Sequence, residues 1–354
     1  MNRSYSPTPL ASGEGNGPVG LTTTIPVEVL LAAGRTPLDL NNALITAPDP
    51  CALVARAERD GYPANVCGWI KGIYGVVLEH GIRQIVAVTQ GDCSQTHAMA
   101  ETLQAEGVEV IPFAYPFDRD RGLLRAQIER LMERFGVGWG EVEQQYEVLH
   151  PARRTVAEID ELNWRSRQVT GAETHRWQVS CSDFGGDPTQ FLADAQAFAD
   201  EARTRPATNG DGIRLGLAGV PPIYGDFFEV LEEDLGARIV HVEVPRQFSL
   251  PWAPETDLVT CYQRYTYPYD IFGRLEDLKA ECARRQVDGL IHYAQSFCFR
   301  QIEDLLIKRE MPLPVLTLEG DRPGPVDART RIRMEAFLES VDARRSGAAR
   351  RDPV

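Results

Sequence analysis

Three of the seven cysteines stand where a strand or loop is expected to pass into a helix. They are Cys67, Cys93 and Cys298. Three thiolates that converge in a fold can hold an iron-sulfur cube by three corners and leave the fourth iron open for chemistry. A helix start suits a thiolate, because the helix dipole and the free backbone N–H groups of the first turn stabilise negative charge. The sequence therefore predicts a set of metal ligands that the tertiary structure brings together.

The case for the other four cysteines is weaker, although Cys51 follows Pro50 at a plausible helix start. For any single cysteine, burial as a small hydrophobic side chain is the commoner role. Cys282 lies in an amphipathic helical segment and is expected in the core, whereas Cys51, Cys181 and Cys261 stay undecided. The cysteines are not grouped as CxxC pairs, which argues against a zinc ribbon or a ferredoxin-type site. Their odd number argues against a complete disulfide framework.

Two histidines are candidates for proton transfer in catalysis. His97 lies one turn after Cys93, and His292 ends an expected buried strand. A non-catalytic interpretation stays open for each: a solvated histidine on a helix surface, and a hydrogen-bonded histidine at a strand end. Asp92 adjoins a proposed ligand but could instead cap a helix, and Glu28 is most simply a favourable charge in the first turn of a helix.

Alternating strand and helix patterns position these residues. Short apolar runs rich in branched side chains predict parallel strands at 84–89, 109–113, 213–217, 238–244, 288–293 and 313–318. Helical periodicity predicts helices at 52–60, 68–80, 94–106, 119–135, 258–265 and 274–286, an apolar helix ending at 235, and a helix opened by Cys298. The pattern occurs twice and predicts an α/β protein with two Rossmann-like, doubly wound lobes whose parallel sheets face a cleft.

The domain organisation follows from composition and from turn-forming residues. We expect a disordered tail over 1–24, an N-terminal Rossmann-like lobe over 25–150 and a mostly helical bridge over 151–211. A C-terminal Rossmann-like lobe with a closing helix is expected over 212–342, followed by a disordered tail over 343–354. Ligands of such sheets bind at the carboxyl ends of the strands, which is where Cys93 and Cys298 fall.

Composition excludes several classes of protein. A formal net charge of −14 argues against a nucleic-acid binder, and there is no apolar run of 18 residues that would span a membrane. The chain fits a cytoplasmic protein of two domains. Gly216, Gly219 and Gly225 do not have the GxGxxG spacing of a dinucleotide site, and no P-loop motif is present. Any ATP hydrolysis must therefore be performed by another protein.

Five segments, in the same order, resemble the family of 2-hydroxyacyl-CoA dehydratase and benzoyl-CoA reductase subunits. They are IPVEVLLAAGRTPLDL (25–40), CGWIKGIYG (67–75), GDCSQTH (91–97), VDGLIHYAQSFCFRQIEDLLIKREMPLPVLTLEGD (287–321) and TRIRMEAFLESV (330–341). The resemblance runs from about residue 25 to residue 341. The family also includes proteins with a double-cubane cluster.

The resemblance implies a [4Fe-4S] cluster held by Cys67 in CGWIKG, Cys93 in GDC and Cys298 in SFC, with the open iron facing a cavity for an acyl-CoA thioester. It implies an oxygen-sensitive enzyme of anaerobic cytoplasm that receives low-potential electrons from a separate ATP-hydrolysing iron-sulfur activator. A heterodimer with a longer paralogous subunit is common in the family, and the sequence does not decide between it and a homodimer. The implied chemistry is reductive radical chemistry, either dehydration by a lyase or reduction by an oxidoreductase.

Two alternative functions stay open. An ATP-coupled reductase of small molecules would use a double-cubane [8Fe-9S] cluster and more of the cysteines. A metal-free two-lobed protein that binds a small molecule would use all seven as structural residues. The acyl group, and the choice between dehydratase and reductase, are not determined by the sequence.

Overall fold

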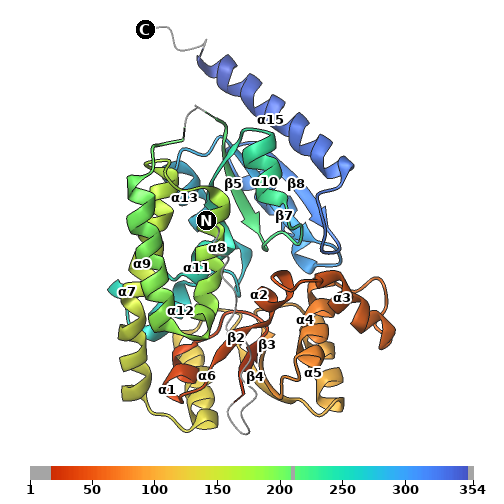
Figure 1. Ribbon diagram of the computed structural model, residues 1–354, viewed down its shortest axis with the longest axis vertical. Coiled ribbons are helices and arrows are strands. Elements are labelled where there is room, and N and C mark those ends of the chain that lie inside the picture. The colour runs from red at the N-terminus through yellow and green to blue at the C-terminus, as the bar shows by residue number, and fades with distance from the viewer. Residues whose placement is uncertain (1–16, 209–211, 350–354) are drawn as a thin grey trace.

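The computed structural model describes residues 17–208 and 212–349, and it has two lobes, each built around a parallel sheet (Figure 1). The first sheet has the order β2-β1-β3-β4, formed by β1 (Val19–Leu21), β2 (Pro37–Asp39), β3 (Gln84–Gln90) and β4 (Glu109–Ala114). The second has the order β6-β5-β7-β8, formed by β5 (Arg214–Gly219), β6 (Arg238–Val242), β7 (Gly289–Gln295) and β8 (Val315–Gly320). The strand order is the same in both lobes, and the predicted α/β class with two lobes is confirmed.

Each sheet is covered on both faces by helices. In β3, Val86 and Val88 enter one hydrophobic core, whereas Ile85 and Ala87 enter another. This alternation follows from the two-residue period of a strand, and the apolar side chains on both faces explain the continuous apolar run in the sequence. In β7, Ile291 likewise faces the core that includes α15 (Ala328–Ala349), on the opposite face of the strand from Leu290.

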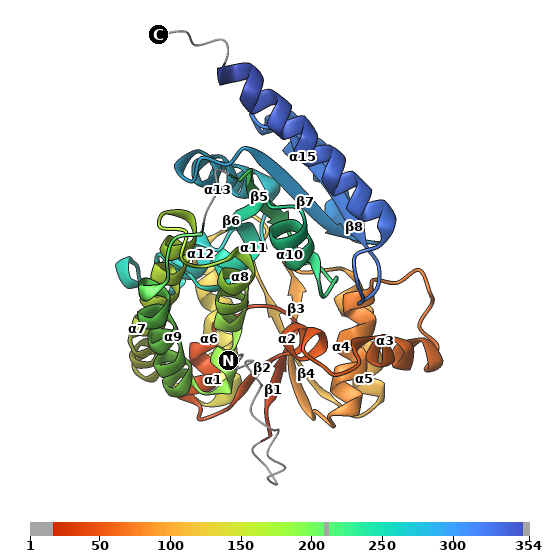
Figure 2. The same cartoon turned by 45° about the horizontal axis from the view of Figure 1, so that its top comes forward.

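Six of the described helices belong to the first lobe. Long helices run beside both lobes (Figures 1 and 2). The helices of the first lobe are α1 (Glu28–Ala32), α2 (Leu40–Ile45), α3 (Pro50–Arg59), α4 (Gly68–Glu79), α5 (Gln95–Ala105) and α6 (Arg121–Phe135). The bridge contains α7 (Trp139–Trp164), α8 (Gly171–Val179), η1 (Ser180–Ser182), η2 (Phe184–Gly186) and α9 (Pro188–Thr204). The predicted boundary at residue 150 falls inside α7.

The second lobe combines short, irregular helices with two long ones. They are α10 (Phe227–Glu229), which continues as the π-helix η3 (Val230–Asp234), then α11 (Glu243–Phe248), η4 (Ala253–Glu255), α12 (Leu258–Arg264), α13 (Ile271–Arg284), η5 (Phe299–Gln301), α14 (Asp304–Glu310) and α15 (Ala328–Ala349). The apolar helix expected to end at 235 is therefore a short α-turn followed by a π-turn. None of the helices in the described ranges is long and apolar enough to cross a membrane.

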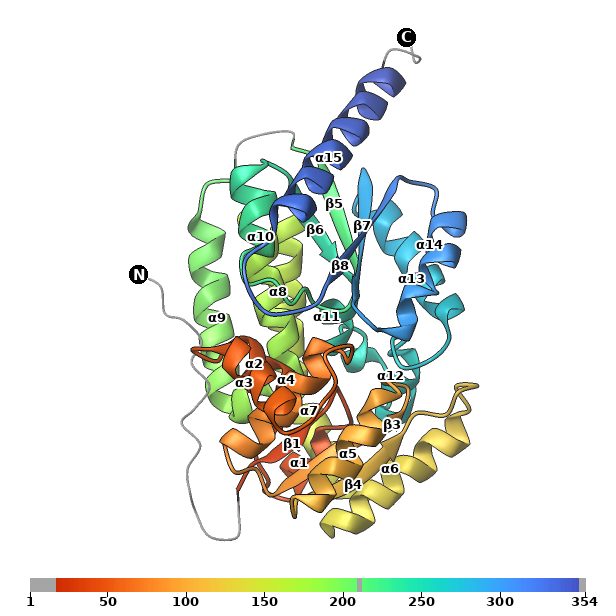
Figure 3. The same ribbon diagram turned by 90° about the vertical axis from the view of Figure 1, so that its right-hand side faces the viewer.

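Both predicted tails need correction where the structure describes them. Residues 19–21, assigned to the first tail, form β1, which pairs with both β2 and β3 and is buried. Residues 343–349, assigned to the last tail, continue α15, which extends away from the second sheet (Figure 3). Backbone pairing explains the first difference, and helix propagation from the buried positions Met334, Leu338 and Val341 explains the second. Residues 1–16 and 350–354 lie outside the described residues.

Candidate functional site

The strand order creates one binding position per lobe. In each sheet the second strand lies on one side of the first strand, and the third strand lies on its other side. The loops that follow the first and third strands therefore run to opposite sides of the sheet, which makes their junction a topological switch point. Cys93 follows β3 and Cys298 follows β7, which are the third strands of the two lobes. Cys67 precedes α4, and α4 leads into the start of β3. The helix therefore runs antiparallel to the strand, and its first turn lies at the carboxyl edge of the sheet.

Cys67 occupies the N-cap position of α4 and is 6 % exposed. Burial raises the pKa of its thiol to about 12, partly offset by the backbone N–H groups of Ile70 and Trp69 that point at the sulfur. Its own backbone N–H donates to Gln95 Oε1 at 3.0 Å. Gln95 is the first residue of α5, so this bond ties the Cys67 segment to the Cys93 segment.

Cys93 lies in the turn between β3 and α5. Burial raises the pKa of its thiol to about 11, and the backbone N–H of Gln95, 3.4 Å from the sulfur, lowers it. Ser94 stands at the N-cap position of α5, but its side chain makes no capping hydrogen bond. Burial also raises the pKa of the neighbouring Asp92 carboxyl to about 6, while the N–H of Cys93 and the Arg300 charge pull it back.

Cys298 follows a sharp turn in the backbone. Phe297 has a φ of +65°, an uncommon conformation for a side chain of this size, and the Cys298 N–H donates to the Gln295 carbonyl at 3.0 Å. The residue opens the 3₁₀ turn η5 rather than the α-helix that we expected. Burial raises the pKa of its thiol, whereas the N–H and the charge of Arg300 lower it.

Cys67, Cys93 and Cys298 come from two lobes but lie close enough for a charge on one thiol to affect the pKa of another. The charges of Cys93 and Cys298 both raise the pKa of Cys67, after the larger effect of burial, and Cys298 acts on Cys93 in the same way. We expected the helix starts to favour thiolates, and the N–H groups do act in that direction. Burial outweighs them, so the free thiols are protonated at neutral pH.

The chemistry of this donor set fits an iron-sulfur cluster better than a single ion. Among the described residues, no group of three or more His, Cys, Asp or Glu side chains is arranged to hold a metal ion. Thiolate sulfurs around one tetrahedral ion lie about 4 Å apart. A cube carries its cysteine sulfurs on separate corners, farther apart, and benefits from backbone N–H groups aimed at sulfur, as all three cysteines have here.

Glycines next to the cysteines allow the lobes to approach closely. A Cβ at Gly68 would lie 2.2 Å from the Asp321 carbonyl oxygen of the second lobe. A Cβ at Gly91 would lie 2.7 Å from the Pro268 side chain, and Gly91 has a φ of +100°. The two glycines thus set how near Cys67 and Cys93 come to the second lobe.

The two candidate histidines have different surroundings. His97 is exposed on α5, and its Nε2 contacts the Thr89 carbonyl at the end of β3. His292 is 1 % exposed on β7, and its Nδ1 lies 2.8 Å from Asp304 Oδ1. A catalytic role for either histidine stays a prediction.

The remaining cysteines lie apart from one another. Cys282 is buried in the core of the second lobe, as expected. Cys181 is buried among the bridge helices, and Cys261 is buried in the hydrophobic core that contains Val86 and Val88. Cys51 is exposed, and its thiol lies 3.1 Å from the Pro323 carbonyl oxygen. The expected helix-start charge of Glu28 is in the first turn of α1 but fully buried.

Glu28 forms part of a buried polar cluster. Its carboxylate accepts hydrogen bonds from Arg153 at 2.6 Å and from the Tyr262 hydroxyl at 2.8 Å. The first lobe, the bridge and α12 are joined by these contacts. Sequence reasoning also missed Gln95 and Arg300, which lie two residues after a proposed cysteine ligand, a spacing that could have drawn attention to both.

Comparison with known families gives one result that covers most of the chain. A family model described as 2-hydroxyglutaryl-CoA dehydratase, D-component, matches residues 22–341. The matched range includes the three cysteines and extends from the end of β1 into α15. No curated protein gives a significant match to the chain.

Proposed function

The chain belongs to the 2-hydroxyglutaryl-CoA dehydratase D-component family, and we propose that it is the iron-sulfur subunit of an enzyme acting on 2-hydroxyacyl-CoA thioesters. One observation carries the proposal: the buried Cys67 and the half-buried Cys93 and Cys298 come from two lobes and lie close enough, at the carboxyl edges of the parallel sheets, for their charges to interact. Family membership supports an enzyme and a dehydratase component. The cluster, its chemistry and the substrate are the proposed part.

The residues of the site have defined parts in this proposal. Cys67, Cys93 and Cys298 hold a [4Fe-4S] cluster, which when bound supplies single electrons at low potential for dehydration of the thioester. Backbone N–H groups after each cysteine donate to the sulfurs, and the burial of Cys67 and the partial burial of Cys93 and Cys298 limit the access of water. Because the free thiols are protonated, assembly of the site releases protons.

The proposal includes other proteins. A D-component is by name one part of a larger system, and the proposed second part is an ATP-hydrolysing iron-sulfur activator that delivers the electrons. The sequence has no P-loop motif, which supports a separate ATP-hydrolysing protein. We further propose a dimer, either of two copies or with a paralogous subunit.

The placement of the other cysteines favours a single cube over a double cubane. A second cube would require further thiols beside the first, but Cys181, Cys261 and Cys282 lie in three different hydrophobic cores. Only the exposed Cys51 could join without rebuilding a core. We propose dehydration rather than reduction as the reaction, because the matching family is described as a dehydratase component.

Iron analysis of anaerobically prepared protein tests the proposal. We expect about four irons per chain, and we expect Cys67→Ser, Cys93→Ser and Cys298→Ser each to lose most of this iron. Cys282→Ser is the matched control, because it removes a thiol of the second lobe from the core and should leave the iron content unchanged. The paramagnetic resonance spectrum of the reduced protein should change when a 2-hydroxyacyl-CoA ester is added.

Several results would count against the proposal. Wild-type protein without iron would support the metal-free two-lobed binding protein. About eight irons per chain, with loss on Cys51→Ser, would support the double cubane. A spectrum that responds to no CoA thioester would remove the assigned substrate class.

A further inference from the structure

Arg300 lies in η5, the 3₁₀ turn that Cys298 opens, and its positive charge acts on the Cys298 thiol and on Asp92. Burial raises the pKa of the Asp92 carboxyl and of the Cys298 thiol, and in both cases the charge of Arg300 acts in the opposite direction. Arg300 is itself only 5 % exposed. Its charge therefore acts through a medium that screens it much less than water would.

The Arg300 side chain is fixed in place by its neighbours. Its Nη2 donates to the Tyr267 carbonyl at 2.6 Å, and its Nη1 donates to the two Glu303 carboxylate oxygens at 2.9 and 3.2 Å. The guanidinium also lies 4.3 Å from the centre of the Tyr267 ring. A planar group with donors on two edges is needed for this arrangement, which an ammonium could not reproduce.

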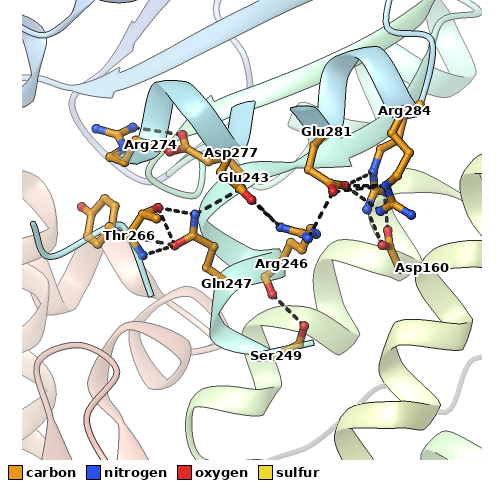
Figure 4. A network of polar contacts seen from close by, with 12 residues as sticks. Asp160, Glu243, Arg246, Gln247, Ser249, Thr266, Arg274, Asp277, Glu281 and Arg284 are labelled. Atoms are coloured by element: carbon orange, nitrogen blue, oxygen red, sulfur yellow. Dashed lines mark hydrogen bonds and ion pairs between the residues drawn. The ribbon is translucent and has the colours of Figure 1, made fainter. Parts of the chain in front are cut away.

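A buried chain of alternating charges supports this arginine from behind. Glu303 also pairs with Arg274, which is fully buried and holds Glu243 through bonds of 2.7 and 2.9 Å. Figure 4 shows Arg274 and Glu243 between α11 and α13. Glu243 in turn accepts the Gly219 N–H at 2.8 Å, at the end of β5. The two arginines and two carboxylates leave this chain neutral overall, but at Cys298 the effect of the Arg300 charge exceeds the opposite effect of Glu303.

We propose that Arg300 is a positioning residue whose fixed positive charge raises the reduction potential of an iron-sulfur group held by Cys67, Cys93 and Cys298. This rests on the proposed function. Reduction adds negative charge to a site that already holds three thiolates and lies beside Asp92. A cation held close to that site stabilises the reduced state more than the oxidised state, and net charge is one of the factors that set cluster potentials.

The test is a redox titration of anaerobically prepared protein, followed by paramagnetic resonance. Arg300→Gln should shift the midpoint potential to a more negative value. Arg300→Lys should give a smaller shift in the same direction, because the charge is kept but the contacts with Tyr267 and Glu303 are not both retained. Arg309→Gln is the matched control, since Arg309 is an exposed arginine of α14 paired with Glu310, and it should leave the potential unchanged.

A second variant gives a shift of opposite sign. Glu303→Gln removes the carboxylate beside Arg300 and should move the midpoint potential to a more positive value, which decides the matter even where Arg300→Gln fails to retain iron. An unchanged potential in Arg300→Gln, or a negative shift in Glu303→Gln, would overturn the assignment. Wild-type protein without iron would instead contradict the proposed function, so the two failures are distinguishable.

Discussion

At the scale of single residues, two buried carboxyl groups meet where the first lobe joins the bridge. Asp183 Oδ2 accepts the Asp39 N–H at 2.8 Å, and its Oδ1 accepts the Gly185 N–H at 2.9 Å. Burial raises the pKa of Asp183 to about 7, and the Asp39 charge raises it further. Burial raises the pKa of Asp39 as well. The native protein therefore binds more protons here than the unfolded chain does.

This pair predicts a stability that falls as the pH rises. An unfolded aspartate ionises at about pH 4, whereas Asp183 in the native state ionises at about pH 7. Between these pH values the unfolded state binds fewer protons than the native state, so the free energy of unfolding falls as the pH rises. Asp183→Asn should remove most of this loss. Between pH 5 and pH 8 the free energy of unfolding of the variant should rise by about 2–4 kcal/mol relative to that of wild type. The measurement is the difference in melting temperature between variant and wild type, compared at the two pH values.

A nearby residue provides the control. Asp187 is an exposed N-cap of α9, where its side chain accepts the N–H groups of Thr189 and Gln190 at 3.1 Å. Asp187→Asn should cost little, because asparagine is also a good N-cap, and the cost should be nearly the same at both pH values. An Asp183→Asn variant that parallels wild type from pH 5 to pH 8 would show that the buried carboxyl is not protonated.

At the scale of elements, the first turn of α4 lies against the loop after β8. Gly68→Ala would place a Cβ 2.2 Å from the Asp321 carbonyl oxygen and 3.3 Å from Ile223 Cδ1. Backbone cannot yield as a flexible side chain does, so α4 and the second lobe must move apart. We expect a destabilisation of about 1–3 kcal/mol and a lower iron content, because Cys67 moves with the turn.

A second helical glycine separates this effect from helix propensity. A Cβ at Gly140, in the first turn of α7, would meet no atom within 4 Å. Gly140→Ala should therefore be neutral or stabilising by up to about 1 kcal/mol. Melting temperature and iron content measured on both variants would decide, and equal behaviour of the two would contradict a steric role for Gly68.

The elements predicted correctly from sequence are those whose pattern is local. The strands at 84–89 and 288–293 are buried on both faces and give continuous apolar runs, so β3 and β7 were found within two residues of their ends. β1 was missed because three residues carry almost no periodic signal and the strand is defined by its partners. Cys67, Cys93 and Cys298 were proposed from local motif and resemblance, and their role as ligands stays a prediction. The spacing of Arg300 after Cys298 could have drawn attention to it, but its contacts with Glu303 and Tyr267 depend on the fold.

At the scale of the whole molecule, the proposed cluster is one of several connections between the lobes. Cys67 and Cys93 belong to the first lobe and Cys298 to the second. A separate polar connection runs from Arg322, after β8, to Glu58 at 2.6 Å, and from Glu58 to the fully buried Lys71 at 2.8 Å. The lobes therefore stay joined without the cluster, but less firmly.

Removal of iron should consequently lower the melting temperature without abolishing folding. A group that binds only the native state stabilises that state. We therefore expect removal of iron by a chelator to lower the melting temperature by roughly several degrees. Cys298→Ser should remove this difference between iron-loaded and chelated protein. Glu58→Gln weakens the polar connection instead and should lower both melting temperatures together, leaving their difference intact. Identical melting of loaded and chelated wild-type protein would mean that the cluster does not join the lobes.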